Sequence, residues 1–166
     1  MKRIYIFCVL VVLLTCGCTY SFFVNAYPHL KTVNVVPFEN MTSEYSLALD
    51  FQNYLVGKFQ SDGKLKISTM TPDSQIEGVV KDYRNEILSY DFGGSVSEYR
   101  VSILFSITMT DMVMSDIIFN NQAMLVTEVY APESTIPDQC TTEEQAIESI
   151  FEKVYENIIN NTLKNW

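Results

Sequence analysis

The chain has 166 residues, a formal net charge of −9 and 48% hydrophobic residues, which fits one ordinary domain with a substantial core. This acidic balance argues against nucleic acid as a partner, because phosphates attract basic surfaces. The single histidine excludes most zinc sites and the usual catalytic triads. We therefore expect no catalytic residues, no metal and no cofactor.

The first residues have the pattern of a secretory signal. Lys2 and Arg3 precede an apolar run from Ile4 to Leu14. This run is shorter than the roughly 20 apolar residues that a membrane-spanning helix needs. A basic start followed by a short apolar segment predicts export from the cytoplasm.

A cysteine closes this segment, which is typical of a bacterial lipoprotein signal. We expect residues 1–17 to be removed and Cys18 to carry the lipid, since Gly17 supplies the small residue before the cut. Cys16 is the alternative acceptor, and an ordinary signal peptide with incidental cysteines is the alternative interpretation. Cleavage would leave 9 basic and 20 acidic side chains. Cys140 would then be the lone thiol, which we expect to be an inert loop residue.

Residues 18–31 are predicted to form an extended lead-in, in which His29 is expected to be an exposed loop residue. Thr32 to Phe38 is rich in β-branched residues and predicts a strand that is stopped by Pro37 and the polar Glu39-Asn40. A helix should follow, capped by Thr42 or Ser43 and ended by Gly63. Its apolar face is predicted from the spacing of Leu47, Phe51, Tyr54, Leu55 and Phe59.

A run of strands is expected next. Leu65 to Ser68 has the pattern of a short strand, and Ile76 to Tyr90 of a long one in which Gly78 marks a bulge or a point of close packing. Gly93-Gly94 then connects to the clearest alternation in the chain, which predicts a half-buried strand. The apolar members are Tyr99, Val101, Ile103, Phe105, Ile107 and Met109. A last strand is expected over residues 117–130.

The chain should end in a second helix. Thr142 and Gln145 have the spacing of a capping box. Glu148, Glu152 and Glu156 stand at four-residue spacing on the side away from the apolar stripe. We interpret them as a solvated acidic face, and a docking face for a basic partner is the alternative. The predicted apolar stripe comprises Ile147, Ile150, Phe151, Val154 and Ile158.

The order of elements is strand, helix, several strands and helix. This order predicts an α+β fold, a two-layer sandwich of a mixed or antiparallel sheet with two helices on one face. Strands that follow one another in the chain are expected to pair antiparallel. Residues 32–166 should form this single domain.

Six segments of the mature chain carry a family resemblance: Cys18 to Phe22, Lys31 to Asn40, the helix from Ser46 to Phe59, Lys64 to Ile67, Ile76 to Tyr83 and Asn165-Trp166. With these segments the chain resembles the LptE-type family of outer-membrane lipoproteins, in the form found in Bacteroidetes-like bacteria. A departure is Phe23-Val24, where family members often carry glycine after Tyr-Ser-Phe.

The resemblance implies a lipid-anchored protein on the periplasmic side of the outer membrane, with no catalysis. It implies a partner, a large β-barrel of the LptD type, and a role in the assembly and insertion of lipopolysaccharide. Lipid A phosphates would need basic side chains, for which Lys81, Arg84 and Arg100 are the candidates. Ordinary solvated charge is the alternative role for each of them.

Two other functions remain as alternatives. A periplasmic-facing lipoprotein that regulates a peptidoglycan enzyme or another envelope machine would usually carry a longer tether after Cys18, whereas here the first predicted strand follows closely. A hydrolase with a carboxylate pair is the third possibility, but no pair is singled out by its sequence context.

Overall fold

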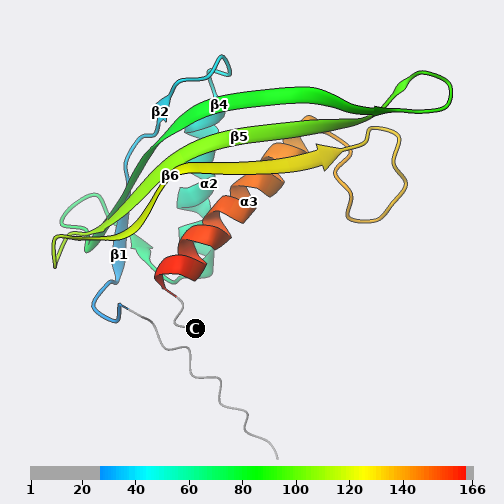
Figure 1. Ribbon diagram of the computed structural model, residues 1–166. Helices are drawn as coiled ribbons and strands as arrows, with labels where there is room; N and C mark the ends of the chain where they lie inside the picture. Colours follow the sequence, from blue (N-terminus) through cyan, green and yellow to red (C-terminus); the bar gives the residue numbers. More distant parts are fainter. Residues whose placement is uncertain (1–26, 164–166) are drawn as a thin grey trace, which may run out of the picture.

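The computed structural model describes residues 27–163. The predictions for the signal, for Cys16 and Cys18 and for the terminal Asn165-Trp166 fall outside these residues. The described chain contains six strands and two helices (Figure 1). In chain order they are β1 (Thr32–Val35), β2 (Glu39–Asn40), α2 (Leu47–Asp62), β3 (Lys66–Ile67), β4 (Ser74–Tyr90), β5 (Val96–Asp111), β6 (Asp116–Tyr130) and α3 (Glu143–Thr162).

The strands form one mixed sheet in the order β3-β1-β4-β5-β6, with β2 also pairing with β4. The three long strands are antiparallel neighbours, as predicted. The antiparallel expectation is wrong at the other edge, where β1 lies parallel to both β3 and β4, and β2 lies parallel to β4. The reason is that α2 is a crossover, which returns the chain to the sheet in its starting direction.

Both helices lie on the same face of this sheet, so the predicted two-layer α+β architecture is confirmed (Figure 1). One boundary differs from the prediction. Glu39-Asn40, expected to stop the first strand, instead forms β2 against Val79 and Val80. β1 itself ends at Val35, two residues before Pro37, which has no N–H for a sheet hydrogen bond.

The helix ends follow local side-chain chemistry only in part. Gly63 ends α2 in the left-handed conformation at φ 63°, as predicted. The predicted caps of α2 are wrong, because the helix begins one residue after Ser46 and no side chain caps it. Thr42 instead belongs to a preceding turn, in which its hydroxyl donates to Asn40 Oδ1 at 2.8 Å. The tertiary contacts of the first turn, with Leu47 buried, therefore position this helix start.

The cap of α3 is the predicted one. The Thr142 hydroxyl accepts the Gln145 N–H at 3.3 Å. The Gln145 amide oxygen accepts the N–H of Thr141 at 2.8 Å, one residue earlier than in a standard capping box.

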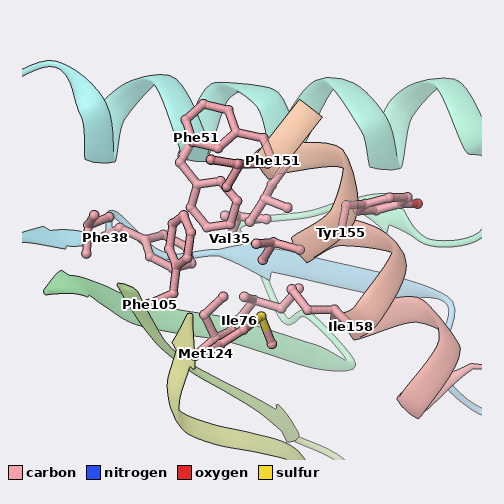
Figure 2. Packing of buried hydrophobic residues seen from close by; sticks show 14 of the residues in the cluster. Val35, Phe38, Phe51, Ile76, Phe105, Met124, Phe151, Tyr155 and Ile158 are labelled. Carbon is pink, nitrogen blue, oxygen red and sulfur yellow. The ribbon is translucent and has the colours of Figure 1, made fainter. Parts of the chain in front are cut away.

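A cluster of phenylalanine rings joins the two layers (Figure 2). Phe51 of α2 is fully buried and its ring centroid lies 4.9 Å from that of Phe38, 4.8 Å from that of Phe105 and 5.1 Å from that of Phe151. These rings come from the β1–β2 connection, from β5 and from α3. Aromatic pairs at such distances add stabilisation beyond the burial of their area.

Gly78 allows β4 to pass close beneath the β1–β2 connection. A Cβ at this position would lie 2.2 Å from the carbonyl oxygen of Ser106 and 2.7 Å from Phe38 Cε1. Close packing is therefore the correct one of the two predicted roles. The bulge interpretation is wrong, because the register of β4 against β5 shifts between Val80 and Asp82 instead.

We expect Gly78→Ala to lower the free energy of unfolding by about 1–3 kcal/mol, because the new methyl group meets backbone that cannot move freely. Gly57→Ala is the matched control. It lies in α2, where a new Cβ would meet no atom within 4 Å beyond the neighbouring backbone of its own helix, and it should stabilise the protein by roughly 0.5–1 kcal/mol. Urea unfolding measures both. Equal midpoints for the native and Gly78→Ala proteins would contradict the close contact.

A buried carboxylate ties the lead-in to the far end of β5. Asp111 is 1% exposed, and its Oδ2 lies 2.5 Å from Nε2 of His29. Its Oδ1 accepts the N–H groups of Val113 at 2.8 Å and Met114 at 2.9 Å. His29 is therefore a partly buried, paired residue rather than the exposed loop residue that its sequence context predicts. The prediction failed because the two residues are 82 positions apart, and a contact over that distance leaves no local pattern in the sequence.

Asp111 should make stability depend on pH. Burial alone would raise its pKa, but the Met114 amide, the His29 ring and the Val113 amide together hold that pKa below its ordinary value. A carboxyl group with a lowered folded-state pKa stabilises the protein above its unfolded pKa and loses this contribution as the pH falls through the folded value. Stability should therefore decline below about pH 4.

We expect Asp111→Asn to be less stable than the native protein near pH 7 and to lose less stability between about pH 4 and about pH 2. Urea unfolding over this range is the measurement. Asp116→Asn, which removes an exposed carboxyl group from the same turn, is the matched control. Parallel curves for the native and Asp111→Asn proteins would show that Asp111 does not have this role.

Candidate functional site

The candidate site is the face of the sheet opposite the helices, which we call the open face. This face contains a hollow that lies over β4, β5 and β6. The hollow combines charged, hydroxyl and apolar side chains. Its lining residues are Asp82, Arg84, Glu86, Arg100, Ser102, Leu104, Leu125, Thr127 and Val129.

The strand register brings two of the three predicted basic residues together. Arg84 of β4 is paired with Ser102, and Glu86 is paired with Arg100, so both guanidinium groups point to the open face from neighbouring strands. Arg84 Nη2 lies 2.9 Å from Asp82 Oδ2, and both side chains are largely exposed. Two arginines therefore share the hollow with two carboxylates.

Lys81 stands apart from this pair. It occupies the register shift between Val80 and Asp82, and it is absent from the lining of the hollow. Its Nζ donates to the backbone carbonyl of Gln122 on β6 at 2.8 Å. This ammonium group therefore contacts the edge strand β6 and does not join the two arginines in the hollow.

The sequence did not single out the carboxylates of the hollow, Asp82 and Glu86. Strict alternation from the buried Ile76 and Val80 would turn them toward the helices. The extra residue at Lys81 reverses this parity, so that Asp82, Arg84 and Glu86 reach the open face. A short break in the alternation of β4 is the only local signal.

The opposite side of β4 holds the start of α3. The Tyr83 hydroxyl donates to Glu143, and the Asn85 amide donates to Glu143 Oε2 at 2.7 Å and to the Tyr130 hydroxyl at 3.0 Å. Burial and the hydrogen bond to Glu143 raise the pKa of Tyr83. These contacts fix the position of α3 beneath the hollow.

The acidic residues of α3 are not uniformly solvated. Glu148 and Glu156 are exposed, as predicted, but Glu152 accepts a hydrogen bond from Tyr54 and pairs with Lys58, both on α2. Burial would raise the pKa of Glu152, but the contacts with Lys58 and Tyr54 outweigh it and lower that pKa. The solvated interpretation is therefore wrong for Glu152, which links the two helices.

Among residues 27–163 there is no group of three or more His, Cys, Asp or Glu side chains that could hold a metal ion. Within the same range, neither helix has the length and hydropathy needed to cross a membrane. Burial, followed by the nearby Glu128 charge, raises the pKa of the Cys140 thiol, which lowers its thiolate fraction and agrees with an inert cysteine.

The fold and the hollow define a two-layer α+β domain with a mixed polar and apolar open face. A sequence profile of the LptE family, described as lipopolysaccharide-assembly, matches residues 30–162. The chain belongs to this lipopolysaccharide-assembly family. A search of curated protein sequences finds no match.

Solved structures share the fold. Protein XCC0632 from Xanthomonas campestris is similar with a TM-score of 0.50 and 12% identity, over 81% of this chain and 89% of that chain. The hypothetical protein CT253 from Chlamydia trachomatis is similar with a TM-score of 0.50 and 8% identity, over 76% of this chain and 96% of that chain. At these identities the similarity shows the architecture alone.

The two arginines of the hollow should contribute little to folding, since exposed ion pairs are worth about 0–1 kcal/mol. We expect the double variant Arg84→Ser/Arg100→Ser to unfold within about 1 kcal/mol of the native protein in urea. Tyr83→Phe is the control on the other side of β4, and it should destabilise more, because the half-buried Glu143 loses one of its hydrogen bonds and keeps the one from Asn85. A larger loss of unfolding free energy in the double variant would show that these arginines stabilise the fold.

Proposed function

We propose that this protein is a lipid-anchored, non-catalytic component of the outer membrane that partners a large β-barrel of the LptD type in assembling and inserting lipopolysaccharide. The observation that carries the proposal is membership of the lipopolysaccharide-assembly family over residues 30–162. The open face adds a surface on which a partner or an amphipathic ligand can lie.

The proposed anchor is the lipid on Cys18, with residues 1–17 as the removed signal, residues 18–31 as the lead-in and residues 32–166 as the domain. Nine positions separate Cys18 from Tyr27. A chain of this length spans at most about 30 Å, so the domain would stay close to the periplasmic leaflet that holds the lipid. This short reach favours a partner in the same membrane over one in the peptidoglycan layer.

The hollow is the proposed contact for lipopolysaccharide. Guanidinium groups bind phosphate with paired, charge-assisted hydrogen bonds, and the hollow holds two of them, on Arg84 and Arg100. A lipid A phosphate would compete with Asp82 for Arg84, a weak exposed pair. Leu104 and the exposed Leu125 form an apolar wall beside the cations, as an acyl chain requires. Lys81 would join only after leaving the Gln122 carbonyl.

Crosslinking and affinity capture from outer membranes test the proposal, with the native chain and Cys18→Ala compared by mass spectrometry. We expect the native chain to recover one large β-barrel with lipopolysaccharide, and Cys18→Ala to recover much less, because it loses its place in the membrane. Recovery of peptidoglycan synthases or hydrolases without a barrel would overturn the proposal in favour of an envelope regulator.

A second arm of the same capture tests the hollow. The triple variant Lys81→Ser/Arg84→Ser/Arg100→Ser should keep the barrel and lose bound lipopolysaccharide about tenfold, which corresponds to roughly 1.4 kcal/mol of binding free energy. Lys66→Ser, which removes an exposed lysine from the edge strand β3, is the matched control and should retain the ligand. Equal recovery by both variants would exclude these three residues as contacts.

A further inference from the structure

The turn between β5 and β6 presents apolar side chains where hairpin turns usually carry polar ones. Met112, Val113, Met114 and Ile117 are 47%, 60%, 66% and 56% exposed. We call these four residues the apolar turn. No residue of this set belongs to the hollow on the open face.

The backbone of the apolar turn is already satisfied from within the protein. The N–H groups of Val113 and Met114 both donate to Asp111, and that of Met112 donates to the Asp73 carbonyl at 2.8 Å. Asp111 itself is buried, so its charge stays away from the surface. Internal pairing of these three N–H groups lowers the desolvation cost of carrying the turn out of water, and the exposed carboxylate of Asp116, just before Ile117, limits its depth to the level of the head groups.

The apolar turn lies at the end of the molecule where the described chain begins. Asp111 joins it to His29, and the same loop that carries Asp73 accepts the N–H groups of Lys31 and Thr32 through the Asp73 carboxylate, at 2.9 and 3.0 Å. Figure 1 shows this turn beside the β3–β4 connection and the start of the described chain. The apolar Met70 of that connection is also exposed.

The opposite end of the long strands is far from this point. β5 has 16 residues, which at about 3.3 Å per residue gives roughly 50 Å between the apolar turn and the β4–β5 hairpin tip. Figure 1 shows that hairpin extending beyond the helices in the other direction. Its exposed Phe92 therefore marks a position distant from the lead-in.

We propose that the apolar turn inserts into the lipid leaflet that holds the acyl chains of Cys18, as a second membrane contact of the same protein. The proposal rests on the lipid anchor of the proposed function. Nine positions after Cys18 the chain reaches Tyr27, and His29 then pairs with Asp111, which accepts the N–H groups of Val113 and Met114 in the turn. The anchor and the turn thus share one end of the molecule, with at most about 30 Å of chain between Cys18 and the described domain.

A lipid surface suits this turn better than a folded partner does. Apolar side chains at a protruding tip can enter the interface between head groups and acyl chains. The apolar turn carries four such side chains, which are flexible or branched. Two membrane contacts also hold a domain in one orientation, whereas a single flexible anchor leaves it free to rotate. The long strands would then carry the hairpin tip away from this leaflet contact, with Phe92 outside the lipid.

Fluorescent labelling of the full mature chain in vesicles tests the inference. The label is an environment-sensitive nitrobenzoxadiazole group on Val113→Cys, in a Cys140→Ser background, with vesicles of phosphatidylethanolamine and phosphatidylglycerol. We expect blue-shifted emission, quenching by spin-labelled lipid and loss of quenching by aqueous iodide. Phe92→Cys is the matched control, and its label should show the opposite behaviour. Met114→Cys provides a second position on the turn in case one label disturbs it.

A label at Val113 that iodide quenches as readily as the label at Phe92 would overturn the inference. So would protection that appears only when a barrel protein is added, or only at protein concentrations that favour dimers. Mass spectrometry of the same samples reports the acyl chains on Cys18 separately. Their absence would overturn the proposed anchor, and the labelling would then be repeated with Cys18→Ser, so that the label on Val113→Cys alone decides whether the turn enters lipid.

Discussion

The contact on which the rest of the structure depends is the ring of Phe51. It touches Phe38, Phe105 and Phe151, which belong to the β1–β2 connection, the central sheet and the second helix. Because both helices direct their apolar stripes to this one cluster, they must lie on the same face of the sheet (Figure 2). Within residues 27–163 the other face carries no helix, and this is where the hollow lies.

A single extra residue in β4 determines the chemistry of that hollow. Without the register shift at Lys81, the side chain of Arg84 would turn toward the helices, where a charge is costly to bury. With the shift, Tyr83 reaches α3 while Arg84 reaches the open face. The same irregularity therefore anchors the second helix and places a guanidinium group beside that of Arg100.

The two ends of the long strands have different chemical surroundings. At one end, Asp111 gathers the lead-in and the apolar turn into one hydrogen-bonded unit. At the other, the β4–β5 hairpin projects past the helices (Figure 1). A protein anchored through its lead-in would thus present the hollow and the hairpin at increasing distances from its anchor.

Sequence alone determined the features that depend on near neighbours. The alternation in β5 and the stripes of both helices are periodic, because they record which side of their own segment is buried. Gly63 and the α3 cap are local, because they depend on the backbone of a single helix end. Only the tertiary structure decided the parallel pairing of β1, the link from Glu152 to α2, the pair of His29 and Asp111, and the side on which Arg84 emerges. These depend on which distant segment supplies the partner, and periodicity carries no information about that choice.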